Sequence, residues 1–549
     1  MVLNQAELQR LLARALGRVR VPDGCAAVLE GSIAEGFGNP SSDVDFLLLD
    51  DSDEVYAGTP TVLFDDGWRI EVRVRSVREA AEDRDALWRL GRAGSAARIP
   101  DDLLNRCQRL ARAVPVLRSR LVAALQRTMP LTELGTIASR AYAHRSRECG
   151  RLAVALTGLG DHAAAATWAE TALVHGAKAW MALRGETYVD AKWLDEQLRR
   201  VGGRGGADAV LVERCQAMLP RAVARLPEPS YVARALSLLA QLGVGGCPLE
   251  PGRARFRRQP GVTTWPIDGQ VHVVRDGRDV FALDDAAARA WRSVVFEQPL
   301  PIVVEGAGAE DAGRLMAEFH RFGFVRLAWR GGGTIAAAPT VTPPPGVRRP
   351  PLSLGGAQLE QEGTGIALVP VPARRFAAAG MALVWCNVMV ENAREDAVGA
   401  VAQGQWGVAA AAVRRALQRV CMSVLSAYGV DPLPAQEEAC AQLAGLPEID
   451  RALAADVLAL EQGAAVVDER SAQRALAAAD QLVSCLRERI GAEGFPCSFL
   501  DAARWRSTLE TFYDWVRIGA HLDSALPLDE LRDVVTSLEQ RRGTVPVLS

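Results

Sequence analysis

Hydrophobic residues recur every three or four positions over residues 4–19, and this spacing predicts an amphipathic helix that ends at Pro22-Asp23-Gly24. Residues 31–42 are mostly small and polar, which is typical of a loop. Asp66-Gly67 predicts a hairpin turn. Four short apolar runs have the length of strands: residues 26–29, 43–49, 61–64 and 68–74. The start of the chain therefore predicts a small mixed sheet with helices.

Farther along, the pattern changes from helical to strand-containing and back. Alanine- and leucine-rich helices are predicted over residues 80–239, up to a glycine- and proline-rich boundary at 243–252. Strands at 271–274 and 280–283 begin a β-containing unit, and Pro343-Pro344-Pro345 indicates a linker before a mostly helical end. We expect an α+β multidomain protein with four units: residues 1–110, 111–250, 255–330 and 350–549.

Composition and charge are those of an ordinary globular protein. The formal net charge of −3 disfavours nucleic acid and anionic membranes as partners. The ten cysteines include no CxxC pair and do not cluster with histidine, so we expect reduced, buried thiols rather than a zinc site. The N-terminus does not resemble a signal peptide, and the apolar run at 381–390 is too short to span a bilayer. These features predict a cytoplasmic protein without a membrane partner.

Two carboxylates, Asp43 and Asp45, lie two positions apart on the second predicted strand. Strand residues alternate between faces, so both acids point one way and the apolar residues beside them point into a core. Neighbouring carboxylates repel each other, and a divalent cation between them supplies the compensating charge. Upstream, Gly31 lets the backbone approach a phosphate closely, and Ser32 adds a hydroxyl and an amide donor.

A third carboxylate, Glu71, falls on the last predicted strand of this sheet. Ile70, Val72 and Val74 alternate with it and form the buried face, which leaves Glu71 on the polar face. Arginines that can pair with acids or with phosphate share that face: Arg69, Arg73 and Arg75.

Gly31-Ser32, the Asp43-x-Asp45 pair and Glu71 resemble, in order and spacing, the DNA polymerase beta-like nucleotidyltransferase superfamily, and especially its kanamycin nucleotidyltransferase-like branch. The resemblance covers roughly the first hundred residues. It implies transfer of a nucleoside monophosphate from a nucleoside triphosphate, with ATP the default donor. It also implies that Asp43, Asp45 and Glu71 are catalytic and bind two Mg²⁺ ions, and that Gly31 and Ser32 bind the nucleotide.

The helical region after the sheet resembles the bundles that close the substrate cleft in several members of this superfamily, most clearly at Lys192-Trp193-Leu194. Lys192 is a candidate ligand of the triphosphate, and a solvated helix lysine is an equally open alternative. We expect Trp193 in the core. Glu170 is a candidate general base on the acceptor side, although a surface glutamate is the commoner case at such a position.

Residues 255–330 are similar in pattern to a PqqD-like domain, a winged-helix unit. The similarity rests on Trp265-Pro266 before the predicted hairpin and on Phe319-His320-Arg321-Phe322-Gly323-Phe324 at the end of a later helix. Such domains recognise the leader of a precursor peptide by adding its strand to a sheet edge. An unrelated winged-helix or scaffold unit is the alternative.

These features predict a Mg-dependent nucleotidyltransferase that modifies a peptide or a small molecule in natural-product biosynthesis. Two alternatives stay open: nucleotidyl transfer to a protein or an RNA, as in toxin–antitoxin systems, and a peptide-binding carrier with an inactive transferase scaffold. The three intact acids argue against the inactive scaffold. The sequence has no long basic stripe, which argues against RNA.

Overall fold

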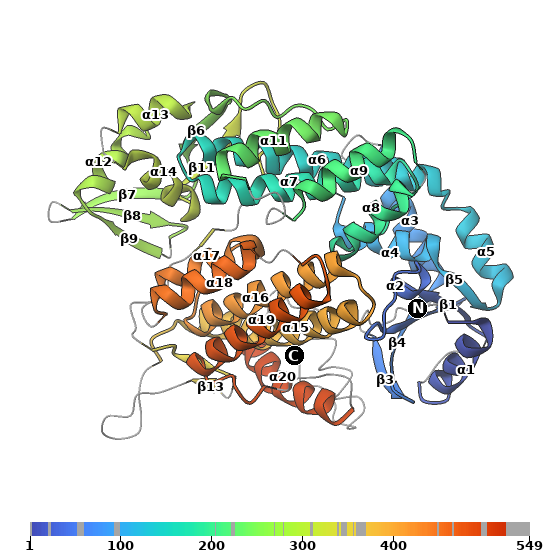
Figure 1. Cartoon of the computed structure of the whole chain (residues 1–549). Helices are drawn as coiled ribbons and strands as arrows, with labels where there is room; N and C mark the ends of the chain where they lie inside the picture. Colours follow the sequence, from blue (N-terminus) through green and yellow to red (C-terminus); the bar gives the residue numbers. More distant parts are fainter. Residues whose placement is uncertain are drawn as a thin grey trace, which may run out of the picture.

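A computed structural model describes most of the chain and shows helices and several small sheets, a mixed α+β architecture (Figure 1). The described residues are 3–19, 24–51, 60–92, 99–203, 205–220, 226–267, 270–277, 279–307, 311–337, 340–341, 349–354, 356–357, 369–446, 449–463, 466–495 and 502–522. The predicted proline linker at 343–346 lies outside these residues.

The N-terminal sheet has five strands in the order β3-β4-β2-β1-β5. Its strands are β1 (Ala26–Glu30), β2 (Val44–Asp50), β3 (Thr61–Asp65), β4 (Trp68–Ser76) and β5 (Val114–Leu117). β2 and β4 pair in parallel, and the other neighbours pair antiparallel. The four predicted strands and the hairpin turn are confirmed, with positive φ at both Asp66 and Gly67 as a type I′ turn requires.

Helices cover both faces of this sheet. Helix α1 (Gln5–Leu16) begins at a capping box between Asn4 and Glu7 and buries its predicted apolar stripe against one face, where Phe46 and Val72 point. Helices α3 (Val77–Arg92) and α4 (Asp101–Arg112) cover the other face, where Leu47 and Leu49 point. The acids of the predicted site share this second face because strand residues alternate.

The helical region follows as predicted. It consists of α5 (Ser119–Arg127), α6 (Leu131–Gly158), α7 (His162–Ala182), the 3-10 turn η2 (Ala191–Trp193), α8 (Leu194–Gly202), α9 (Ala207–Met218) and α11 (Glu228–Gln241). The helices α6 and α7 pack along each other, and glycines allow their close packing. Helix α11 packs closely against α7 in turn, since a Cβ at Gly176 of α7 would collide with Leu239 of α11.

The middle unit contains two three-stranded sheets. The predicted hairpin is confirmed within the sheet β7 (Val262–Ile267), β8 (Gln270–Arg275) and β9 (Asp279–Leu283). The second sheet was not predicted and joins β6 (Ala254–Arg258), β10 (Gln298–Pro299) and β11 (Val325–Trp329). The 3-10 turn η3 (Pro251–Arg253) leads into it, and its helices are α12 (Asp285–Ser293), α13 (Leu300–Gly306) and α14 (Ala312–Arg321). One hydrophobic core runs from the helical region into this unit, through Leu159, Phe256 and Trp291.

The C-terminal bundle is helical, as predicted, apart from the short pair β12 (Leu352–Ser353) and β13 (Gly356–Ala357). Its helices and 3-10 turns are α15 (Ala373–Ala402), α16 (Trp406–Ala427), η4 (Gln436–Glu438), α17 (Ala439–Gln442), η5 (Leu443–Gly445), α18 (Arg451–Gly463), α19 (Glu469–Arg489) and α20 (Ala502–Leu522). Figure 1 shows this bundle beside both the N-terminal sheet and the helical region.

The apolar segment around residues 381–390 belongs to a longer helix, α15, than the sequence predicted. By length and composition it is apolar enough to cross a membrane, although the apolar run at 381–390 was predicted to be too short. Of its most apolar 18-residue window, 72% is buried inside the protein. The helix therefore has the environment of a bundle's central helix.

Candidate active site

The predicted acids come together on neighbouring strands of the five-stranded sheet. Asp45 on β2 is the register partner of Glu71 on β4 and, on its other side, of Glu30 at the end of β1. Asp43 lies directly before β2. The sequence analysis missed Glu30, whose one signal was its position at the end of a buried strand directly before Gly31. Four carboxylates thus lie at one end of three adjacent strands.

A short helix, α2 (Gly31–Ala34), replaces the predicted loop at its beginning. Gly31 has φ +79°, and a Cβ there would collide with the Asp45 carboxylate. Only glycine satisfies both conditions. The carbonyl of Ser32 accepts hydrogen bonds from the amides of Phe37 and Gly38, at 2.9 and 3.1 Å. The turn that carries the Gly31-Ser32 pair is therefore held by its own backbone hydrogen bonds, and it packs against Asp45.

Arginines lie beside three of these acids. Arg69 of β4 donates a hydrogen bond to Asp43. Arg109 of α4 lies 3.2 Å from Glu30 and 3.9 Å from Asp45. The arginine-rich polar face expected on β4 is thus confirmed, and the sequence analysis missed the contribution of Arg109 because it comes from a helix beyond the sheet.

Burial makes the ionised carboxylates costly. Burial and repulsion from Asp43 and Asp45 together raise the pKa of Glu71 to about 7, against the opposing charges of Arg69 and Arg73. Burial also raises the pKa of Asp43 and of Asp45 against the pull of their arginines. An added positive charge would stabilise the ionised form of all three acids.

The residues fit a hard divalent cation in chemistry. Asp43 Oδ1 is buried without a hydrogen-bond partner, as expected of an atom that a cation would satisfy. Among the residues described, however, no three His, Cys, Asp or Glu side chains are grouped closely enough to hold a metal ion. Arg69 donates to Oδ2 of Asp43, so a cation that binds both oxygens of this carboxylate has to displace Arg69, whereas Oδ1 accepts no hydrogen bond.

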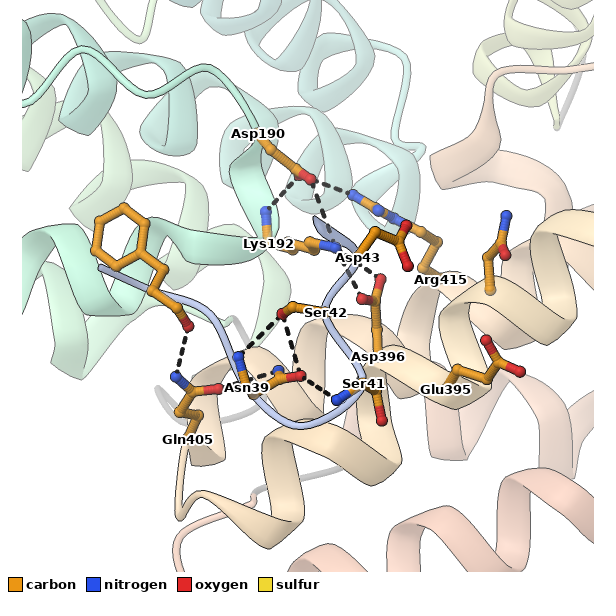
Figure 2. Close-up of polar contacts among 12 residues, drawn as sticks. Asn39, Ser41, Ser42, Asp43, Asp190, Lys192, Glu395, Asp396, Gln405 and Arg415 are labelled. Carbon is orange, nitrogen blue, oxygen red and sulfur yellow. Dashed lines mark hydrogen bonds and ion pairs between the residues drawn. The ribbon is translucent and has the colours of Figure 1, made fainter. Parts of the chain in front are cut away.

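Lys192 points toward the end of the sheet that carries Asp43, but an acid from the C-terminal bundle holds it (Figure 2). Its Nζ lies 2.8 Å from both carboxylate oxygens of Asp396 on α15. Asp190 accepts from the backbone amide of Lys192 at 3.0 Å and from Arg415 of α16 at 3.2 Å. The solvated-lysine interpretation is wrong, since Lys192 is mostly buried and paired, and its role as a triphosphate ligand stays a prediction.

Trp193 is buried, which confirms its predicted place in a core. Its ring stacks on Phe37 with the ring centres 5.5 Å apart and the planes 14° from parallel. The guanidinium of Arg200 covers Phe37, 4.1 Å from the ring centre. The segment after Gly31-Ser32 therefore packs against the helical region through Phe37.

Glu170, the predicted acceptor-side base, lies in α7 and is mostly buried rather than on the surface. Arg414 of α16 lies 2.6 Å from its carboxylate. This contact joins the helical region to the C-terminal bundle, and the role of Glu170 in proton transfer stays a prediction.

The C-terminal bundle contributes residues that the sequence analysis missed. Glu395 of α15 lies 3.4 Å from Arg69, and Gln405 donates to the carbonyl of Phe37 at 3.0 Å. Asn39 donates to Gln405 at 3.3 Å (Figure 2). These partners are more than 300 positions apart in the chain, so no local pattern could have indicated them.

Two parts of the chain therefore enclose the acids: the turn after β1 and the start of α16 with the end of α15. Comparison with known proteins adds no assignment to this geometry, because no protein-family model and no curated protein matches the chain significantly.

Proposed function

We propose that this protein is a nucleotidyltransferase that moves a nucleoside monophosphate from a nucleoside triphosphate, ATP by default, to a peptide or small-molecule acceptor. The observation that carries the proposal is the register of β2 and β4, which pairs Asp45 with Glu71 beside the positive-φ Gly31. Four acids lie at the same end of three adjacent strands and pack against a glycine turn. This arrangement is suited to binding a cation together with phosphate.

Each residue has a distinct part in this proposal. Two Mg²⁺ ions on Asp43, Asp45 and Glu71 would neutralise charge on the α-phosphate and on the leaving pyrophosphate. The Gly31-Ser32 turn offers a close backbone approach and a hydroxyl to the triphosphate. The acceptor oxygen attacks the α-phosphorus, the bond to the β-phosphate oxygen breaks, and pyrophosphate leaves. Glu71 and Glu170 are the candidates for receiving the acceptor's proton.

The middle unit supports a peptide as the acceptor. Its sheet β7-β8-β9 has two edges, and Pro266 leaves the β7 edge one backbone donor short. The β9 edge contains no proline, and its Val280 is 64% exposed. An extended peptide could add to this edge by backbone hydrogen bonds. We therefore favour a precursor peptide of a modified-peptide pathway as the substrate, in the cytoplasm.

Pyrophosphate release tests the proposal. The protein is incubated with Mg²⁺, each of the common nucleoside triphosphates, and peptides or metabolites encoded or made by its gene neighbourhood. We expect pyrophosphate release with at least one pair of nucleotide and acceptor. The rate should fall at least about 10³-fold in Asp43→Asn, because this variant removes a ligand of the Mg²⁺ ions that neutralise the reacting phosphates. Asp85→Asn is the matched control, since Asp85 is 67% exposed and its ion pair among the described residues is with the neighbouring Arg84.

Retained turnover in Asp43→Asn, with activity equal to that of Asp85→Asn, would contradict the assignment of Asp43. A folded protein that releases no pyrophosphate under any of these conditions would contradict the proposed reaction. Circular dichroism and the melting temperature establish that each variant is folded.

A further inference from the structure

We infer that the C-terminal bundle is an electrostatic gate over the nucleotide site. Glu395 and Asp396 of α15 form ion pairs with Arg69 and Lys192, the two cations that would bind a triphosphate, and the bundle must move away before the nucleotide can bind. This inference rests on the proposed nucleotidyl transfer. It assigns a regulatory contact to a part of the chain whose role the sequence did not indicate.

Two adjacent acids of one helix hold cations from two different parts of the protein. Glu395 lies 3.4 Å from Arg69 on the sheet, and Asp396 lies 2.8 Å from Lys192 at the end of the helical region. All four side chains are at most 22% exposed. Arg69 in turn donates to Asp43. Arg69 and Lys192, the two cations in question, are thus both paired with carboxylates of the chain itself.

The same helix also presses on the turn that leads into Asp43. At Gly399, a Cβ would collide with Asn39 and would come within 2.7 Å of the Ser41 Cβ. Directly beyond the helix end, Gln405 bonds to the Phe37 carbonyl and to Asn39. The absence of a side chain at Gly399 lets the helix lie flat on this turn.

The ion pairs within the site can be exchanged for ion pairs with a bound Mg²⁺-triphosphate. A bound triphosphate brings about four negative charges and its Mg²⁺ brings two positive ones. The triphosphate can replace Glu395 and Asp396 as the counterion of Arg69 and Lys192, and the cation can replace Arg69 on Asp43. After this exchange Arg69, Lys192 and Asp43 each have a new partner, and the released carboxylates of Glu395 and Asp396 become hydrated as α15 moves away.

Buried polar contacts join the helices of the bundle to one another, so we expect these helices to move together. Inside it, Arg487 of α19 lies 2.6 Å from Glu391 of α15 and bonds to Asn387, all of them buried. Its polar contacts with the site are ion pairs and hydrogen bonds, which water and phosphate can replace. A buried hydrophobic cluster that contains Phe37, Tyr188, Trp193 and Val408 accompanies them. This cluster and the ion pairs of Arg414 with Glu170 and of Arg415 with Asp190 set the free-energy cost of release, which triphosphate binding has to supply.

Isothermal titration with Mg²⁺-tripolyphosphate tests the gate without assuming a base or an acceptor. Glu395→Gln/Asp396→Asn removes the internal counterions, and Gly399→Leu prevents the close approach of α15 to the turn without changing charge. We expect both variants to bind tripolyphosphate at least about tenfold more tightly than the wild type, which corresponds to about 1.4 kcal/mol. The control is Glu469→Gln/Asp480→Asn, which changes the net charge equally within the bundle and should bind like the wild type.

Hydrogen–deuterium exchange supplies a second readout. In the wild type, exchange over residues 395–405 should rise when Mg²⁺-tripolyphosphate binds. Equal or weaker binding by both variants, or tighter binding by the charge variant alone, would overturn the gate. If the wild type releases pyrophosphate from ATP while all four proteins bind tripolyphosphate equally, the gate alone is wrong. If no protein binds tripolyphosphate or releases pyrophosphate, the proposed function fails with it.

Discussion

At the scale of single residues, Gly31 is where backbone conformation and catalytic geometry meet. Gly31→Ala would strain a residue at φ +79° and would drive a methyl group into the Asp45 carboxylate. Because Asp45 must then shift, we expect nucleotidyl transfer to fall by about 10² or more. Gly67→Ala is the control, since its φ of +82° carries the same backbone strain and no atom lies within 4 Å of the new methyl group. Equal activity in the two variants would show that contact with Asp45 is unimportant.

His175 makes stability depend on pH. Its ring stacks on Tyr142, and its Nδ1 is buried without a hydrogen-bond partner. Burial, together with the nearby positive charges of Arg145 and Lys178, lowers the pKa of His175 to about 3. Between pH 3 and 6.5 the unfolded chain therefore binds a proton that the folded chain does not, so stability falls as pH drops below about 6.5.

Between pH 7 and 5 this histidine alone should remove about 2 kcal/mol from the free energy of unfolding. Urea unfolding of the wild type and His175→Phe at both pH values measures the difference. The variant should lose about 2 kcal/mol less than the wild type over this interval. Parallel losses in the two proteins would mean that His175 is protonated in the folded state.

The alternation rule was enough to predict the main acids of the site. It placed Asp45 and Glu71 on polar faces of their strands, and the register makes them neighbours. It could not predict that Arg69 would donate a hydrogen bond to Asp43 or that Glu395 would form an ion pair with Arg69, because side-chain pairing depends on which elements meet in space. Lys192 was identified as a residue of interest, whereas its partner Asp396 had no local signature.

At the scale of elements, the predictable parts were those with strong local signals. The hairpin of β3 and β4 was recognised from Asp66-Gly67, and α1 from its apolar stripe. The second sheet of the middle unit was missed because β6 and β10 are short and pair across about 40 residues of chain. The small helix at Gly31 was missed because glycine, serine and asparagine near it are typical of a loop.

The pairing of α15 with α19 supports a prediction about the bundle. Glu391 is fully buried and lies 2.6 Å from Arg487 and 3.0 Å from Arg394. Glu391→Ala leaves Arg487 buried without its carboxylate, so we expect a loss of about 3–5 kcal/mol in the free energy of unfolding. Asp480→Asn should cost less than about 1 kcal/mol, since Asp480 is 38% exposed. Chemical denaturation of both variants gives the comparison, and equal losses would contradict a special role for the buried pair.

At the scale of the whole molecule, the chain folds back so that its C-terminal half contacts the acid site formed by its first hundred residues (Figure 1). The four predicted units were derived from local composition, and this derivation contains no information about how units pack. The shared core of the helical region and the middle unit is one consequence, because cutting the chain between them would expose Phe256 and Leu159. Point substitutions therefore test the middle unit better than a deletion does.

Peptide recognition by the middle unit can be tested at the edge of its sheet. Val280→Asp places a charge on the exposed β9 edge and removes apolar contact, so the KM for a precursor peptide should rise about tenfold with kcat unchanged. Trp265→Ala, on the opposite edge beside Pro266, is the control and should leave the KM unchanged. An unaltered KM in Val280→Asp would exclude strand addition at β9.

The account depends most on the claim that the acid cluster transfers a nucleotide rather than a phosphate. The direct measurement compares ATP labelled at the α-phosphate with ATP labelled at the γ-phosphate, with Mg²⁺ and an acceptor on which pyrophosphate is released. Nucleotidyl transfer predicts that only the α-label moves to the acceptor, and that Asp45→Asn abolishes its movement. Transfer of the γ-label, or undiminished α-label transfer by Asp45→Asn, would contradict the account.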